Sequence, residues 1–401
     1  MIKVNNTSFL NSMPPSLFLS CTALSMFLLM SSVLLEGASY KSKLRNDITR
    51  PFVGKEFWPS PQMDWQLNNG KMEVMISKGG KTHDIHLLTH QLKSQEGSFS
   101  QSVRLSFEKI NPNKIKRAGF KFGIVGAMPE EYRSNLFGSS GYMAGVTSEG
   151  KLFGPGIESK TNLPKSALED LRLTLKVEHK GNNFDFILEA SKRSNEDKSS
   201  VLLFINKSVR MKKGFLGNLS LFADYAQKNH APSIPADIKE FQTDVTFQDW
   251  QISGDKVKQN LNQTFGPILW TQYTLHRGIM KMTAQIAPMG KMNKEKVYLE
   301  LLKKGKWKKV QSSGIHEYAS TAHFRIENWD DKQEIPYRVV LKNGDSIGEW
   351  KGTIRKDPKD KNTIKLAAMS CMKDGAFPNH YLQQNVIAQD PDILFFAGDQ
   401  L

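Results

Sequence analysis

Short segments of alternating polarity recur through most of this 401-residue chain and limit what it can fold into. Between Trp58 and Gly254, apolar side chains fall on every second residue in segments such as Ser102–Phe107 and Leu171–Val177. Residues that favour tight turns separate these segments, as in Lys180–Asn183. A period of two with Gly and Asn turns is typical of antiparallel strands in β-sandwiches. The pattern therefore predicts a mainly β fold.

The order of these segments is similar to that of one group of sandwiches. The succession Ser102–Phe107, Gly119–Gly126 and Tyr142–Val146 resembles a concanavalin-like or laminin-G-like jelly roll, which we expect over residues 61–254. Residues 39–60 are expected to form a linker ahead of it. Many domains of this kind bind sugars, but a fold does not establish a function. Glycan binding and a structural spacer role both stay open.

A second β module follows the first. Segments including Thr264–Leu275, Met280–Ile286 and Tyr337–Leu341 alternate in the same way, and they predict an immunoglobulin-like or fibronectin-like sandwich over residues 255–361. The stretch Lys303–Lys309 has five lysines and one Trp, and it is expected at a hairpin tip. It is interpreted either as a binding site for a phosphate polymer or as a solvated turn.

The N-terminus contains one long apolar run, Leu17–Leu35, which holds no charged residue. Small residues follow it at Gly37–Ser39. Residues 1–38 are therefore predicted to be a secretory signal peptide, with a retained membrane anchor as the alternative reading. Either reading places the rest of the chain in the periplasm or outside the cell.

Charge and cysteine content narrow the range of partners. The chain has 55 Lys and Arg against 40 Asp and Glu, a formal net charge of +15. Such a charge attracts polyanions, but a solvated lysine-rich surface also explains it and is favoured, since no nucleic-acid motif accompanies it. Only Cys371 lies outside the predicted leader, because Cys21 is within it. Cys371 cannot form an internal disulfide, which leaves metal ligation or a buried thiol.

The last stretch, residues 362–401, has a different pattern. Ile364–Met369 and Ile393–Ala397 are apolar runs typical of buried parallel strands, and Asn379–Gln389 between them predicts a helix. This order predicts a βαβ unit with a right-handed crossover. Because ligands bind at the carboxyl ends of such strands, we expect Cys371 and Asp399 to face one site.

These strand ends resemble the calcineurin-like metallophosphatases, specifically the alkaline phosphatase D type. The resemblance rests on Met369–Cys371 and on Pro391–Gln400, and a small β-sandwich ahead of the catalytic domain agrees with it. It implies a metal-dependent phosphoric ester hydrolase with two divalent or trivalent ions, iron and calcium. Cys371 would ligate one ion and Asp399 would bridge both. Asp374 is a further candidate oxygen ligand or a helix cap, and His380 is a weaker candidate ligand.

The resemblance also implies motifs that would lie beyond Leu401, namely an Asn-His pair and later His clusters. Two or three candidate ligands cannot fill two coordination shells, so we expect the chain alone not to hydrolyse its phosphoester substrate, and no catalytic residue is assigned. Whether the chain is an enzyme stays open. The predicted fold is thus a jelly-roll sandwich, an immunoglobulin-like or fibronectin-like sandwich, and the first βαβ unit of a metallophosphatase domain. The alternative is a non-enzymatic extracytoplasmic module that binds a glycan or an envelope polymer.

Three histidines near the start of the first sandwich, His83, His86 and His90, are close enough in sequence to suggest a metal site. No carboxylate pattern supports one, so they are interpreted as surface or strand residues.

Overall fold

The computed structural model describes residues 37–75, 82–93, 96–108, 115–128, 130–138, 140–193, 199–210, 215–225, 243–290, 294–343, 346–372 and 378–398. The predicted signal segment lies outside the described residues, apart from its last two positions. Residues Gly37–Leu401 form one compact unit.

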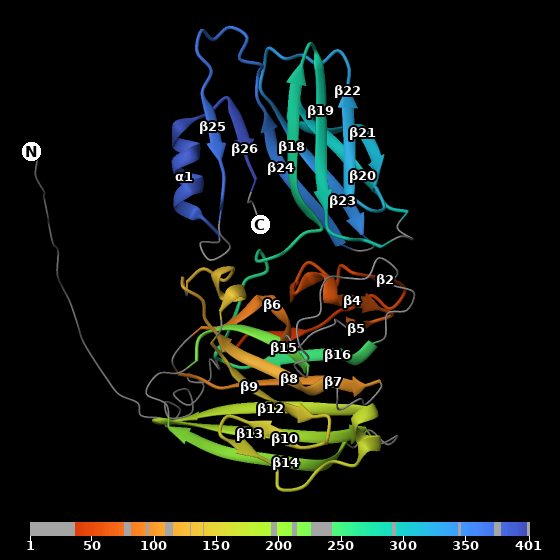
Figure 1. Cartoon of the computed structure of the whole chain (residues 1–401), viewed down its shortest axis with the longest axis vertical. Helices are drawn as coiled ribbons and strands as arrows, with labels where there is room; N and C mark the ends of the chain where they lie inside the picture. Colours follow the sequence, from red (N-terminus) through yellow and green to blue (C-terminus); the bar gives the residue numbers. More distant parts are fainter. Residues whose placement is uncertain are drawn as a thin grey trace, which may run out of the picture. The chain divides into compact units, whose positions relative to one another are not determined.

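Two large antiparallel sheets build the first sandwich (Figure 1). The first sheet has the order β14 (Ser199–Arg210), β13 (Asn183–Arg193), β12 (Leu171–Lys180), β7 (Phe99–Phe107), β16 (Thr243–Ser253), β5 (Lys71–Met75), β4 (Trp65–Asn68) and β2 (Thr49–Arg50), with β1 (Ser39–Lys41) paired to β16. The second has the order β11 (Ile157–Glu158), β10 (Leu152–Gly154), β9 (Tyr142–Thr147), β8 (Ile115–Ile124), β15 (Gly217–Tyr225), β6 (Thr82–Leu92) and β17 (Val257–Gln259), with β3 (Phe57–Ser60) paired to β6. Short 3-10 turns lie at η1 (Gln62–Asp64), η2 (Ser134–Phe137) and η3 (Lys165–Glu169).

The alternation in the sequence explains the core of this sandwich. In β7 every second residue from Phe99 to Phe107 is buried, which is the pattern of a strand with one face on a core. Trp65 and Trp250 are fully buried in the same cluster. Each such side chain contributes roughly 2 kcal/mol or more by leaving water. The prediction of a mainly β sandwich is confirmed.

The first sandwich extends beyond the range predicted for it. The three strands β1, β2 and β3 fall within residues 39–60, which were expected to be a linker. At the other end, β17 lies beyond residue 254, where the sandwich was predicted to end, and it pairs with β6. These strands have two to four residues, which is too short for a period of two to be recognised.

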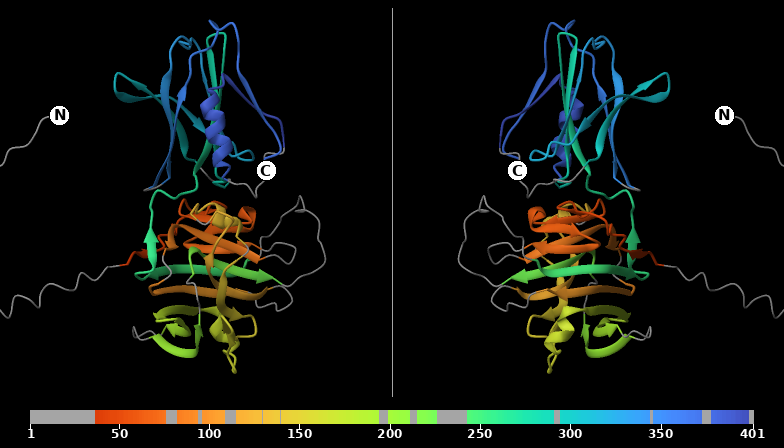
Figure 2. Two further views of the ribbon diagram at one scale, coloured as in Figure 1. Left: turned by 90° about the vertical axis from the view of Figure 1, so that its left-hand side faces the viewer. Right: turned by 90° about the vertical axis from the view of Figure 1, so that its right-hand side faces the viewer.

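Seven strands of the second β module form two further sheets, shown from two sides in Figure 2. The three-stranded sheet has the order β18 (Ile268–His276), β19 (Ile279–Ile286) and β22 (Thr321–Ile326). The four-stranded sheet has the order β21 (Lys306–Gly314), β20 (Lys296–Lys303), β23 (Ile335–Asn343) and β24 (Ser346–Ile354). Both sheets contribute to a separate apolar cluster that includes Met280, Leu299 and Val339.

The terminal segment consists of β25 (Leu366–Met369), α1 (His380–Gln389) and β26 (Ile393–Phe396). The two strands pair in parallel, with Met369 opposite Phe396 (Figure 1). A helix lies where the sequence predicts one, and the two strands are largely exposed although their apolar runs are typical of buried strands. All four residues of β26 are exposed, including Phe395 at 54%. One helix and two strands cannot cover both faces of a parallel sheet, which is normally covered on both.

Candidate functional site

A row of polar side chains crosses three neighbouring strands of the first sandwich on the face that points away from the core. The strand register places Lys121, Ser220 and His86 in one row. Four residues along each strand, Arg117, Asp224 and Thr82 form another row, and Asp84 lies in the row between them, opposite Phe222. We call this group the polar tract, defined by Thr82, Asp84, His86, Arg117, Lys121 and Asp224.

Hydrogen bonds connect most of the polar tract. The Lys121 ammonium donates to Asp84 Oδ2 at 2.8 Å, and both side chains are largely buried, with about one seventh of their surface exposed. At the outer end, Arg117 Nε donates to Asp224 Oδ2 at 2.9 Å, and the Thr82 hydroxyl donates to Asp224 Oδ1 at the same distance. The Arg117 guanidinium also lies 5.4 Å from the Phe153 ring centre. The tract therefore runs from a half-exposed ion pair to a buried one.

Two buried polar atoms of the tract have no hydrogen-bond partner in the described structure: Asp84 Oδ1 and His86 Nδ1. Burial raises the pKa of Asp84, although the neighbouring Lys121 ammonium opposes this. Burial, together with a smaller effect of the Lys121 charge, lowers the pKa of His86 to about 3. The inner end of the tract thus holds a carboxylate oxygen and a neutral imidazole nitrogen that have no partner. Buried polar atoms of this kind call for an explanation, such as a bound water, an ion or a ligand group.

The three histidines singled out in the sequence all lie on β6 and are buried. Their interpretation as strand residues is confirmed, and that as surface residues is wrong. They do not share one site, because His83 Nε2 is 2.8 Å from Asp64 Oδ2 on the core-facing side of the strand, whereas His86 lies on the opposite side. His90 contacts the Thr89 hydroxyl through Nδ1 at 2.9 Å.

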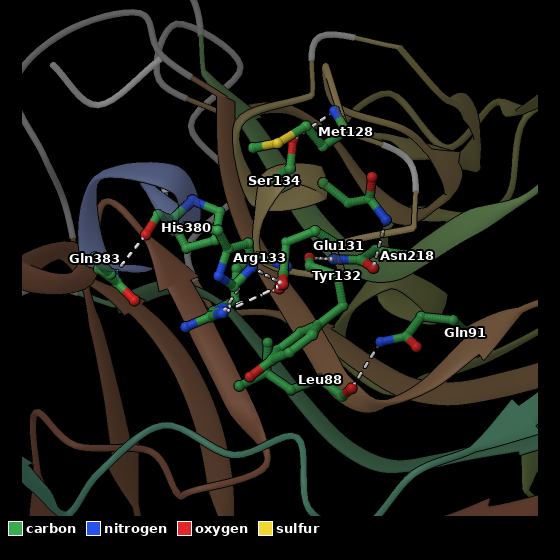
Figure 3. Close-up of polar contacts among 12 residues, drawn as sticks. Leu88, Gln91, Met128, Glu131, Tyr132, Arg133, Ser134, Asn218, His380 and Gln383 are labelled. Carbon is green, nitrogen blue, oxygen red and sulfur yellow. Dashed lines mark hydrogen bonds and ion pairs between the residues drawn. The ribbon is translucent and has the colours of Figure 1, made fainter. Parts of the chain in front are cut away.

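A second polar cluster is formed by residues of the turn before η2 and of α1 (Figure 3). Arg133 Nε donates to Glu131 Oε1 at 2.9 Å, and His380 Nε2 lies 2.7 Å from Glu131 Oε2. Burial alone would raise the pKa of Glu131, but the hydrogen bonds from Arg133 and His380 lower it to about 2. The carboxylate is thus fully engaged, which indicates a structural ion pair. His380, the weaker candidate ligand, lies in this contact.

The strand ends of the terminal segment lie side by side. The Cys371 N–H donates to the Gly398 carbonyl at 3.3 Å, and the Ala397 N–H donates to the Met369 carbonyl at 2.8 Å. Ser370 Oγ and Cys371 Sγ are 3.2 Å apart, and the thiol is exposed. The left-handed φ of 55° at Cys371 turns the chain sharply after β25. The pairing of the two strands thus brings Cys371 next to the residue that precedes Asp399.

Asp374 and Asp399 lie outside the described residues, so their predicted roles stay predictions. Among the residues that the structure describes, no three His, Cys, Asp or Glu side chains group closely enough to hold a metal ion. The single thiolate of Cys371 cannot supply the ligands that a site for two ions requires. In the described part of the chain, no helix is long and apolar enough to span a membrane.

Comparison with known proteins gives only distant structural matches. No family model matches the chain, and no curated protein does. A lectin from Bauhinia forficata in complex with GalNAc is 8% identical, covering 56% of this chain and 99% of the lectin at a TM-score of 0.34. The Emp47p carbohydrate recognition domain is 10% identical, and the match covers 56% of this chain and 98% of that domain at a TM-score of 0.30. The Ca²⁺-bound VIP36 exoplasmic/lumenal domain is 6% identical, and the match covers 52% of this chain and 90% of that domain at a TM-score of 0.29. These TM-scores are all below 0.5, so they add nothing to what the strand pairing itself establishes.

The polar tract was not predicted from the sequence. Its residues come from β6, β8 and β15, which are far apart in the chain, and only the register of the sheet brings them together. The one available signal was the polar alternation Thr82, Asp84, His86, which indicates a polar face on this strand.

Proposed function

We propose that this chain is an exported β-sandwich module that binds a glycan at the polar tract. The observation that carries the proposal is the pair of buried atoms without partners, Asp84 Oδ1 and His86 Nδ1, on one face of the sheet. A sugar hydroxyl can donate to either atom, and it can accept from the nearby Lys121 ammonium. Satisfying such buried atoms would contribute about 1 kcal/mol or more each.

The ends of the tract suit different parts of a sugar. Arg117 and Asp224 offer paired donors and acceptors at the more exposed end, where the Arg117 guanidinium packs against the Phe153 ring. Sites for small polar ligands combine a few placed polar groups with apolar walls in this way.

Glycan binding is tested with the purified chain on a glycan array, followed by calorimetry with the best ligand. We expect Asp84→Asn to weaken binding by about tenfold or more, since it removes the charged acceptor. Asp170→Asn is the matched control, because Asp170 pairs with Arg104 away from the tract. Circular dichroism checks that both variants are folded. If no glycan binds, or if both variants bind as the wild type does, the proposal is wrong.

A second candidate function is the start of an exported metallophosphatase domain. It is supported by the position of Cys371 beside Gly398 at the ends of two parallel strands, as the resemblance to the alkaline phosphatase D type requires. In this proposal Cys371 and Asp399 contribute to a metal site that further sequence completes, and the substrate is a phosphoester.

Two measurements test this second function. Sequencing the genomic DNA after codon 401 in all frames should show an Asn-His pair and a Gly-His-x-His motif. The purified chain with iron and calcium should leave bis(p-nitrophenyl) phosphate unhydrolysed. If the downstream motifs are absent, the proposal of a metallophosphatase domain is rejected. Hydrolysis by the purified chain would contradict the proposal that its metal site is incomplete.

A further inference from the structure

The hairpin between β20 and β21 carries a dense group of lysines. Its two-residue loop is Lys304-Gly305, and the exposed side chains of five lysines surround it. We call this group the hairpin tip: Lys303, Lys304, Lys306, Lys308 and Lys309. Within the part of the chain that the structure describes, none of these five ammonium groups forms an ion pair. Many lysines elsewhere do, such as Lys71 with Glu108 and Lys180 with Asp185.

The arrangement costs stability in the folded chain. Lys303 and Lys306 are directly opposite one another across the hairpin. Like charges in this position repel and destabilise a hairpin, whereas an acidic residue on either strand would stabilise it. The repulsion would be relieved by an external anion that lies along the tip, which is the condition for favourable binding.

The aromatic residues near the tip show which kind of anion fits. The Arg338 guanidinium lies 4.8 Å from the Trp307 ring centre, and Lys309 Nζ lies 4.2 Å from the Tyr298 ring centre. Each ring thus already has a cation stacked on it. Nucleic-acid sites for single strands use aromatic faces on which bases stack, and membrane-surface sites insert apolar side chains. The two rings are thus engaged by cations, and the single exposed apolar side chain Val310 beside Lys309 is too little to anchor the tip in a membrane surface.

We propose that the hairpin tip binds a linear phosphate polymer that carries no bases. The anion lies along the outer edge of β21, where alternate residues such as Lys306 and Lys308 are about 7 Å apart. Successive phosphates contact successive ammonium groups, and the net charge of +15 favours the approach of the polymer. This surface is separate from the polar tract, and the proposal does not depend on glycan binding.

The test measures binding of inorganic polyphosphate to the purified chain over a range of salt concentrations. The variant Lys303→Gln, Lys306→Gln, Lys308→Gln is compared with Lys71→Gln, Lys151→Gln, Lys180→Gln, whose lysines all have acidic partners. Each triple substitution removes three positive charges, so an effect of net charge alone would be equal in both. We expect the tip variant to bind polyphosphate at least about tenfold more weakly than the wild type. The slope of log K against log salt concentration should become shallower by roughly two. The control variant should bind within about threefold of the wild type.

Two outcomes would reject the proposal: the wild type does not bind polyphosphate, or the two triple variants bind it equally well. Tighter binding of oligo(dT) than of polyphosphate at equal charge would show that bases are recognised. Binding of vesicles with anionic lipids in preference to polyphosphate would show a membrane surface instead. The tip variant is expected to have a melting temperature equal to or above that of the wild type, since it removes a repulsion, so loss of binding will not reflect unfolding.

Discussion

At the scale of single residues, His86 couples the interior of the first sandwich to pH. Its side chain is 1% exposed, and burial with the nearby Lys121 charge lowers its pKa to about 3 in the folded chain. In the unfolded chain the pKa returns to about 6.5. The unfolded state therefore binds the proton first as pH falls, so stability is full above about pH 6.5 and decreases below it.

The resulting prediction concerns His86→Gln, which removes the titrating group. Between pH 7 and pH 5 the wild type should lose about 2 kcal/mol of unfolding free energy that the variant does not lose. Urea unfolding at both pH values measures the difference. His316→Gln, on the exposed loop after β21, is the control and should keep the slope of the wild type. Equal slopes for wild type and His86→Gln would contradict the buried, neutral state of His86.

At the scale of elements, the turn between β20 and β21 depends on one glycine. Lys304 and Gly305 have φ values of 50° and 72°, the left-handed pair of a type I′ hairpin turn. A Cβ added at Gly305 would meet nothing within 4 Å, so only the backbone opposes a side chain there. Gly305→Ala should therefore cost about 1 kcal/mol of unfolding free energy.

The matched control for this turn is Gly314→Ala at the end of β21. A Cβ there also meets nothing within 4 Å, but the φ of Gly314 lies outside the left-handed region. The control should be neutral or slightly stabilising, because alanine restricts the unfolded chain. Chemical denaturation of the two variants separates the backbone effect from packing. A larger loss in Gly314→Ala would show that the turn geometry is not what limits this hairpin.

The elements also show what a sequence can predict here. Strands such as β7 and β12 were recognised because one face packs on the core and the period of two is regular. The strands β1 to β3 were missed because two to four residues hold no period, and they are fixed by pairing with distant partners. The polar tract was missed for the same reason, since Asp84, Lys121 and His86 meet only through long-range register. The expectation that Cys371 and Asp399 face one site came from a single βαβ unit that is local in sequence, and it stays a prediction because Asp399 lies outside the described residues.

At the scale of the whole molecule, the described residues form two apolar clusters and an exposed terminal segment. One cluster lies within the first sandwich, and the other joins the two sheets of the second module. No residue of β25, α1 or β26 belongs to either cluster. The contacts that join this segment to the residues before it include the ion pair of Lys361 with the buried Asp392 carboxylate and the exposed ion pair of Arg355 with Asp390. Exposed pairs of this kind contribute little stability.

Removal of residues 362–401 should therefore leave the unfolding of the remaining chain almost unchanged. Because the buried apolar area that stabilises both sandwiches is retained, we expect calorimetric melting temperatures within about 2 °C of those of the full chain. In the full chain, amide hydrogens of β25 and β26 should exchange with solvent much faster than those of β7 and β12, since strands exposed on both faces open easily. A drop of many degrees on truncation would mean that the terminal segment shares a core with a sandwich. Slow exchange in β26 would mean that its apolar side chains are covered in solution, and would direct attention to a partner on that surface.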